Sequence, residues 1–265
     1  MLRSVFAKTL RDRRRGAIGW SVGLVALVAV IAAYWPSVRD SPELQAFARD
    51  LPEALRALVG GGDYGTAAGY LNAELFSFIV PLLFLIVAIG LGARAVAAEE
   101  ERGTIDLLMA MPLTRRRMLL EKVAAGVVVL LALGAVLFGA TVLGAAVADM
   151  GVEVARLAEI TLATVLLALP FGALALAIGC ATGARGLASG LTATAAVAAY
   201  MLNGLAPLVD SLEGYRDLSP FAWYASDAVL AGDGLALWRA GLLVGVAAVL
   251  LAVALVALER RDLRA

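Results

Sequence analysis

The chain has 265 residues, of which 62% are hydrophobic and 17% charged, and its net charge is zero. Soluble domains are usually about 45–50% apolar and about 25% charged, so the composition is typical of a membrane protein, and zero net charge argues against a nucleic-acid partner. Because histidine is absent and Cys180 is the single cysteine, the chain has no Ser-His-Asp triad, no internal disulfide and no usual zinc ligand set.

The sequence contains six apolar runs that are long enough to cross the ~30 Å hydrocarbon core of a bilayer as helices. A soluble protein of buried helices is the alternative, but most of its helices would carry a polar face, which most of these runs lack. We therefore expect an all-α membrane protein with one transmembrane domain, residues 1–265. The spans are expected at about residues 17–35, 75–98, 120–147, 159–181, 187–209 and 239–258.

Residues 1–15 precede the first span and have apolar and basic side chains on different helical faces. Val5, Phe6 and Leu10 share one face, whereas Lys8 and Arg11 lie on another. This pattern predicts an amphipathic helix on the cytoplasmic leaflet before the chain turns into the bilayer; a disordered basic tail is the alternative. The apolar run that follows is longer than that of a signal peptide and has no convincing cleavage site, so we expect it to be retained.

The loop after the first span, residues 36–70, contains two helix-start signals. Ser41-Pro42-Glu43 and Asp50-Leu51-Pro52-Glu53 each combine an N-cap residue, a proline and an acid in the first turn. Apolar residues recur at helical spacing through both signals, and Gly60-Gly61-Gly62 ends the run; they are Leu44, Phe47, Leu51, Leu55 and Leu58. We expect one broken amphipathic helix that packs on the outer leaflet or on the bundle, with substrate contact as the alternative.

The segment between the second and third spans has acidic, apolar and basic residues in succession. Thr104 is placed to cap a short helix that Pro112 ends, and Thr114 to cap the next helix. The short helix is apolar although it lies outside the membrane, and such a surface requires a covering partner. A solvated turn whose arginines only set the topology is the alternative. The candidate residues are Glu99, Glu100, Glu101, Arg102, Gly103, Thr104, Ile105, Asp106, Leu107, Leu108, Met109, Met111 and Pro112.

The last loop contains the segment Leu218-Ser219-Pro220-Phe221-Ala222-Trp223-Tyr224. Considered alone, this segment indicates a turn that ends an interfacial helix, with its aromatic residues at the level of the lipid head groups. Small residues four apart, such as Gly186 and Gly190, are typical of helix packing in membranes. Alanine-rich chains produce such pairs by chance, so no single pair identifies an interface.

Lysine and arginine residues are distributed unevenly between the two sides of the predicted bundle. With alternating spans, 16 of the 22 lie on the side of the termini and 6 on the other. The positive-inside rule therefore predicts that both termini are cytoplasmic. The acidic residues divide in the opposite sense, with 8 on the side of the termini and 14 on the other. We expect a multi-pass protein of the plasma (cytoplasmic) membrane.

The spans lack the residues that ion coupling or ATP binding requires. No Asp, Glu, Lys or His lies near the middle of a span, whereas proton- or sodium-coupled transporters usually have such residues inside the bundle. The two lysines, Lys8 and Lys122, belong to no Gly-Lys-Ser/Thr sequence, so the chain has no P-loop. Energy for active transport would therefore come from another polypeptide.

The stretch E-E-E-R-G-T-I-D-L-L-M-A-M-P-L-T-R-R-R, residues 99–117, resembles the cytoplasmic loop of bacterial and archaeal type-2 ATP-binding-cassette (ABC) exporter permeases. Two weaker similarities accompany it. Residues 218–224 resemble the Ser-Pro-Phe segment of this family, and Glu259-Arg260-Arg261-Asp262-Leu263 resembles its Arg-Arg-Asp-Leu ending. Six spans and an amphipathic start also match, so the resemblance covers the whole chain, although the long loop 36–70 has no counterpart in the family pattern.

The resemblance implies a fold with a cytoplasmic amphipathic N-terminal helix, a short cytoplasmic coupling helix between spans two and three, and external interfacial helices. It also implies that residues 99–112 dock into a groove on a separate cytosolic ABC ATPase, which binds ATP and Mg²⁺. In the resembled family the last external region closes the pathway from outside. The residues that would belong to this external gate are Ser219, Pro220, Phe221 and Trp223.

We therefore expect the permease subunit of an ATP-driven exporter, acting with a second copy or a paralogous permease. A path lined by apolar residues, Thr and Asn suits an amphiphilic, drug-like or lipid-like substrate better than an ion. The chain would be no enzyme by itself and would hold no cofactor or metal; its partners would be the ATPase, the second permease and membrane lipid. The alternative is a non-transporting membrane scaffold or assembly subunit. A membrane-embedded enzyme has less support, because no catalytic constellation is present.

Overall fold

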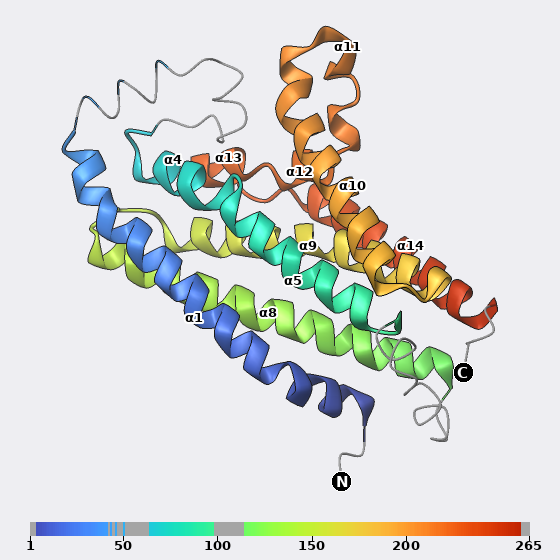
Figure 1. The fold of residues 1–265 in the computed structure, drawn as a ribbon. Helices are drawn as coiled ribbons and strands as arrows, with labels where there is room; N and C mark the ends of the chain where they lie inside the picture. The colour runs from blue at the N-terminus through green and yellow to red at the C-terminus, as the bar shows by residue number, and fades with distance from the viewer. Residues whose placement is uncertain are drawn as a thin grey trace.

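The computed structural model describes residues 4–41, 43, 46, 50, 64–97 and 114–260 (Figure 1). Within these ranges the chain is helical and contains no β-strand. Six helices are long and apolar enough to cross a membrane. The structure thus confirms the all-α membrane class that the apolar runs predict.

The six candidate spans follow the order and approximate positions predicted from the sequence. They are α1 (Val5–Arg39), the run α4–η1–α5 (Ala67–Leu71, Asn72–Phe76 and Ile79–Arg94), α8 (Arg115–Val147), α9 (Val154–Thr182), α10 (Arg185–Leu205) and α14 (Leu237–Arg260). Short elements connect α10 to α14: η2 (Ala206–Leu208), α11 (Asp210–Glu213), η3 (Arg216–Leu218), α12 (Pro220–Tyr224), α13 (Ser226–Ala228) and η4 (Val229–Asp233).

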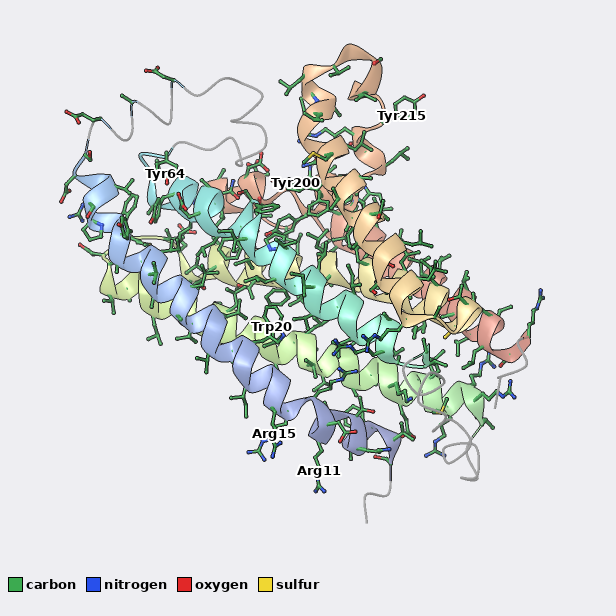
Figure 2. All side chains as sticks on the ribbon, viewed as in Figure 1. Arg11, Arg15, Trp20, Tyr64, Tyr200 and Tyr215 are labelled. Atoms are coloured by element: carbon green, nitrogen blue, oxygen red, sulfur yellow. The ribbon has the colours of Figure 1, made fainter. Side chains whose placement is uncertain are left out.

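Both termini lie at the same end of the bundle, which we call the terminal end (Figure 1). It contains the starts of α1 and α8 and the ends of α5 and α14. The opposite end, which we call the distal end, contains the starts of α4 and α9 and the short elements between α10 and α14. Figure 2 shows Arg11 and Arg15 on the α1 segment at the terminal end and Tyr215 among the short distal elements. The positive-inside rule predicts that the terminal end is cytoplasmic.

α1 is one continuous helix that includes both the predicted N-terminal segment and the first span. Ser4 caps it, because its Oγ accepts a hydrogen bond from the Ala7 amide at 3.2 Å. Its 35 residues correspond to about 52 Å of helix at about 1.5 Å per residue, well beyond the ~30 Å hydrocarbon core. The structure therefore joins the predicted N-terminal helix to the first span in one helical run, and Pro36 lies inside α1 rather than ending it.

The broken amphipathic helix expected within residues 36–70 lies mostly outside the described residues. The segments on either side of this loop contact each other. The Tyr70 hydroxyl of α4 donates a hydrogen bond to the Ile31 carbonyl oxygen of α1 at 2.9 Å. The Tyr70 ring centroid also lies 5.2 Å from that of Trp35. These contacts join the end of α1 to the start of the second span.

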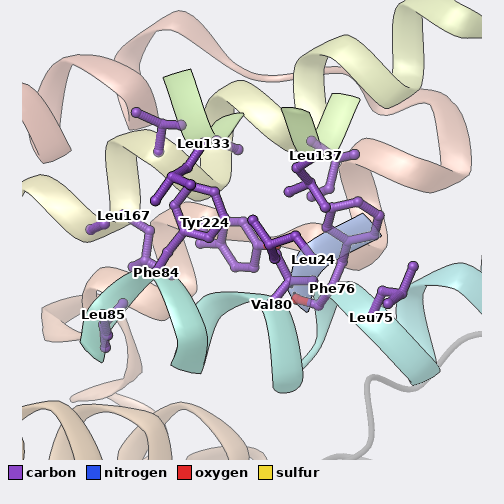
Figure 3. Packing of buried hydrophobic residues seen from close by; sticks show 14 of the residues in the cluster. Leu24, Leu75, Phe76, Val80, Phe84, Leu85, Leu133, Leu137, Leu167 and Tyr224 are labelled. Atoms are coloured by element: carbon purple, nitrogen blue, oxygen red, sulfur yellow. Dashed lines mark hydrogen bonds between the residues drawn. The ribbon is translucent and has the colours of Figure 1, made fainter. Parts of the chain in front are cut away.

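α9 is the central helix of the bundle. It contacts α5, α8, α10 and α14, and 61% of its most apolar 18-residue window is buried, the largest share of any span. α1 lies outside this group and packs along α8. Figure 3 shows the buried core between the helices, where Leu24 of α1, Phe84 of α5 and Leu137 of α8 belong to one hydrophobic cluster.

α5 and α9 cross at a pair of glycines. A Cβ atom on Gly92 would overlap the carbonyl oxygen of Gly172, and one on Gly172 would lie 3.3 Å from the carbonyl oxygen of Ala88. The missing side chains therefore allow the two backbones to touch. This contact matters in a bilayer, because lipid tails are as apolar as leucine and transmembrane helices associate through close packing.

Gly92→Ala should push α5 away from α9. The extra methyl group has no space, so we expect a loss of about 1–3 kcal/mol of stability and a lower unfolding temperature in detergent micelles. Gly90→Ala is the matched control, because nothing lies within 4 Å of a Cβ at Gly90. Equal unfolding temperatures for the two variants, measured by circular dichroism, would contradict the close crossing.

Cysteine labelling tests the predicted orientation. In a Cys180→Ser background, Glu153→Cys and Asp217→Cys should react with a membrane-impermeant maleimide in intact cells, because both positions are exposed at the distal end. Arg116→Cys, exposed at the terminal end, should react only after the membrane has been opened. Reaction of Arg116→Cys in sealed cells would contradict cytoplasmic termini.

Candidate functional site

The predicted coupling residues, 99–112, lie outside the described residues, so the structure shows the helices on either side of them. α5 ends at Arg94 before this segment, and α8 begins at Arg115 after it. Thr114 caps α8 as predicted, since its Oγ1 accepts a hydrogen bond from the Arg117 amide at 3.3 Å.

Lys122 joins the two helices that flank the predicted coupling segment. Its Nζ donates a hydrogen bond, 2.6 Å long, to the carbonyl oxygen of Ala95, the C-cap residue of α5. A cation at the end of a helix also interacts favourably with the helix dipole. Next to this bond, Val96 is buried in a cluster with Leu119 of α8 and Leu258 of α14. The two ends of the segment are therefore anchored on three helices.

The start of α8 also contacts α1 and α14. Glu121 of α8 accepts hydrogen bonds from the Phe6 amide of α1 and from Arg117 Nε, both at 3.1 Å. Arg115, the first residue of α8, contacts α14: its Nη1 donates a hydrogen bond to the Leu258 carbonyl oxygen at 3.4 Å. Because one short region of α8 contacts the ends of α1, α5 and α14, a displacement of this region would act on all three helices.

Ser219 and Pro220 begin the short helix α12 at the distal end. Ser219 Oγ accepts a hydrogen bond from the Phe221 amide at 3.2 Å and donates one to the Ala199 carbonyl oxygen of α10 at 2.8 Å. Pro220 occupies the first turn, where a missing amide hydrogen costs nothing. The segment thus ends η3 at Leu218 and starts α12 at Pro220, with Ser219 between the two short helices.

Phe221 belongs to a chain of aromatic contacts between helices. Its ring centroid lies 6.0 Å from that of Phe171 in α9 and 5.3 Å from that of Tyr200 in α10. The Tyr200 ring is in turn 5.3 Å from that of Phe78, the residue just before α5. The predicted gate residue Phe221 therefore contacts α9 and α10 directly and the start of α5 through Tyr200.

Tyr224 is a distal residue that the sequence analysis did not select. It is buried, and its hydroxyl donates a hydrogen bond to the Phe76 carbonyl oxygen at 2.9 Å. The same hydroxyl lies 3.1 Å from Thr164 Oγ1 in α9. Burial raises the pKa of Tyr224, so the hydroxyl keeps its proton and remains a donor. Its position three residues after Phe221, on the same helical face, was the available signal.

Trp223 has a different role from Phe221. Its indole Nε1 donates a hydrogen bond to the Asp217 carbonyl oxygen in η3 at 2.8 Å. This bond closes residues 217–223 into a compact turn. The four predicted gate residues are thus neighbours in α12 and its N-cap, with Ser219 and Phe221 buried and Trp223 hydrogen-bonded to η3.

Two charged residues at the start of α9 hold the segment before α14. Arg156 Nη1 donates hydrogen bonds to the carbonyl oxygens of Leu230 and Ala231, both at 3.2 Å. Glu159 Oε2 accepts a hydrogen bond from the Leu235 amide at 3.1 Å. Gly232, at φ +115°, lies against the Arg156 guanidinium in a conformation that favours glycine. These contacts could not be predicted from the sequence, because the partners lie more than 70 residues apart along the chain.

The family described as ABC-2 family transporter protein matches residues 3–263. The chain belongs to the ABC-2 transporter family. No curated protein gives a significant match to the chain.

ABC-2 family proteins of this type are the membrane components of transporters, and they typically work with an ATPase subunit. The six apolar helices agree with a multi-pass component of this kind. The family is not catalytic itself. Among the residues that the structure describes, no group of three or more His, Cys, Asp or Glu could hold a metal ion.

Tyr224→Phe should loosen the distal end without removing the ring. It leaves the Phe76 carbonyl oxygen and Thr164 without this partner, and a lost buried hydrogen bond costs about 1–3 kcal/mol. We expect a lower unfolding temperature in detergent. Tyr215→Phe is the control, because Tyr215 is 57% exposed. A Tyr224→Phe protein as stable as the Tyr215→Phe protein would show that this hydroxyl is not a structural anchor.

Proposed function

We propose that the chain is the permease subunit of an ATP-driven ABC exporter. A separate cytosolic ABC ATPase binds ATP and Mg²⁺, and two permease copies, or this chain and a paralogue, form the translocation path. The main support is the family match, which extends over residues 3–263 and therefore includes the predicted coupling segment.

Coupling starts at residues 99–112 in this proposal. ATP binding closes the ATPase subunits and displaces the segment, and the displacement reaches the spans through its anchored ends. Lys122 binds the end of α5, and Glu121 binds the start of α1. Packed elements with fixed contacts move as units, so a shift at this base favours a rigid-body response of the helices.

The exposed face of α10 supports a second permease copy. Against its own bundle α10 buries only four small residues, and nothing lies within 4 Å of a Cβ at Gly186 or Gly190. Small residues let transmembrane helices approach closely. The 18-residue apolar window of Arg185–Leu208, which contains α10, is less hydropathic than that of any other described span, and this suits a protein interface better than contact with lipid. The buried residues are Ala188, Thr192, Ala196 and Gly204.

The charge distribution along the spans favours ATP over an ion gradient as the energy source. Ionisable side chains of the described spans lie towards helix ends, as Glu74, Arg94 and Arg239 do. An ion-coupled transporter usually places such groups inside the bundle, near the middle of the membrane. An interior of apolar side chains and hydroxyl groups such as that of Thr164 suits an amphiphilic, drug-like or lipid-like substrate.

Leu107→Asp combined with Leu108→Asp should release the ATPase. Apolar anchors at the centre of an interface often contribute about 2 kcal/mol or more each, and two carboxylates would prevent their burial. The tagged permease is purified with its ATPase, which is identified by its Walker motifs, and copurification and ATP hydrolysis are measured. Leu218→Asp is the control, because Leu218 is a 69% exposed leucine at the distal end.

Unchanged copurification and ATP hydrolysis in the double variant would rule out this segment as the coupling element. The intact complex is then placed in sealed vesicles with a fluorescent amphiphile. ATP-dependent movement of the amphiphile that persists when proton and sodium gradients are abolished supports the exporter. ATP hydrolysis without movement of any amphiphile tested would favour the non-transporting scaffold.

A further inference from the structure

The start of α1 has a strong positive charge next to the membrane. Residues 5–15 contain five basic side chains and one acidic side chain, that of Asp12. Because the first span is expected to begin at about residue 17, we expect these side chains at the level of the lipid head groups. Arg11 and Arg14 are both exposed, and Figure 2 shows Arg11 pointing away from the bundle. The positive charge is therefore accessible from the bilayer surface.

An open groove between α1 and α8 begins at these arginines. Arg11 and Arg14 line it on α1, and Ile18 and Ser21 line it further along the same helix. The four positions are spaced at i, i+3, i+7 and i+10, so they share one helical face, and they extend over about 15 Å at about 1.5 Å per residue. The groove therefore changes from charged to mainly apolar in the direction of the membrane centre.

The wall of the groove on α8 is apolar. It consists of Val128, Val129 and Ala132. Val128 is 41% exposed, and Ile18 on the facing helix is 52% exposed. Both walls therefore present apolar surface that the protein leaves uncovered, and an acyl chain of the adjacent leaflet can lie along them.

The described lining residues include no group that would bind a positively charged head group. They contain no carboxylate and no aromatic ring, which are the groups that hold ammonium and choline. Asp12, the single acidic residue of α1, is not among them. Arginine, in contrast, binds phosphate oxygens through two parallel N–H···O bonds. The lining thus favours a phosphate diester without a cationic substituent.

The groove lies on a different side of α8 from the end of α5. Ala95 and Val96 contact α8 and α14 there, through Lys122 and the buried cluster of Leu119 and Leu258. The described lining of the groove comes from α1 and α8. Arg13 also lines it and has an interaction within the chain, so we assign the head group to Arg11 and Arg14.

We infer that this groove binds an anionic phospholipid of the phosphatidylglycerol class from the adjacent leaflet. The phosphate lies at Arg11 and Arg14, and one acyl chain lies along Ile18 and Val128. Such a lipid contacts two helices at once, and α1 packs mainly on α8. The lipid therefore helps to hold α1 in place. The site belongs to one protomer and does not require the proposed ATPase.

Photolabelling of the permease alone tests the site. The protein is placed in phosphatidylcholine liposomes with a trace of phosphatidylglycerol or phosphatidylcholine probe, each with the same diazirine-bearing acyl chain, and labelled peptides are identified by mass spectrometry. The stretch of α14 around Val249 and Val253, both exposed, reports contact with bulk lipid. Relative to this stretch, the phosphatidylglycerol probe should label the groove walls at least about fivefold more, since one basic residue near an anionic surface contributes about 1 kcal/mol.

A matched pair of variants tests the charge. Arg11→Gln combined with Arg14→Gln should remove the preference for phosphatidylglycerol. Arg15→Gln should keep most of it, because Arg15 is exposed on the same helix but is not a lining residue. Arg15→Gln therefore controls for the general attraction between a basic helix and an anionic probe.

A second pair tests the apolar wall. Ala132→Phe narrows the groove and should reduce labelling of its walls by both probes. Ala135→Phe, at another exposed alanine of α8 outside the lining, should not. Because the four substituted residues Arg11, Arg14, Ala132 and Ala135 are exposed, we expect each variant to fold, and unfolding temperatures in phosphatidylcholine check this.

Equal labelling of the groove walls by the two probes would overturn the inference. So would an equal loss of preference in Arg15→Gln and in the double arginine variant, or unchanged labelling of Ala132→Phe. In a Cys180→Ser background, disulfide-linked dimers of Ile18→Cys in these liposomes would place a second copy at the groove and also overturn it. Added phosphatidylglycerol should raise the unfolding temperature of the wild type more than that of the double arginine variant. Failure of the ATPase to copurify would affect only the proposed function.

Discussion

Helices in a bilayer gain little by turning apolar surface away from lipid tails, so their association depends on close van der Waals contact. In this protein such a contact brings the backbones of α5 and α9 together where they cross at Gly92 and Gly172. α9 is then surrounded by α5, α8, α10 and α14, and α1 lies along α8. The second span is hydrogen-bonded at both of its ends. Lys122 binds Ala95, the C-cap residue of α5, at the terminal end, and Tyr224 binds Phe76 of η1 at the distal end.

The small residues that allow this crossing also create space on the side of α14. Gly92 and Gly172 line an apolar cavity among α5, α8, α9 and α14, and Lys122 is both a wall of this cavity and the link between the helices that flank the predicted coupling segment.

Part of the candidate site could be predicted from local sequence because its interactions are local. Thr114 caps α8 across three residues, and Ser219 followed by Pro220 is the usual order of an N-cap residue and a first-turn proline. Tyr224 was missed because its partners Phe76 and Thr164 are 148 and 60 residues away along the chain. The assignment of residues 99–112 to ATPase coupling depends on the family resemblance and lies outside the described residues.

The sequence by itself determined the class of the protein, the number and order of its spans and the positions of the loops. A bilayer requires a long apolar helix for each crossing, so length and composition are sufficient to find the spans. Only the tertiary structure decided that α1 continues without a break, that α9 is central, and that a cavity lies among α5, α8, α9 and α14. The physical reason is that neighbouring helices in lipid are selected by the fit of their surfaces, which hydrophobicity along a single helix does not encode.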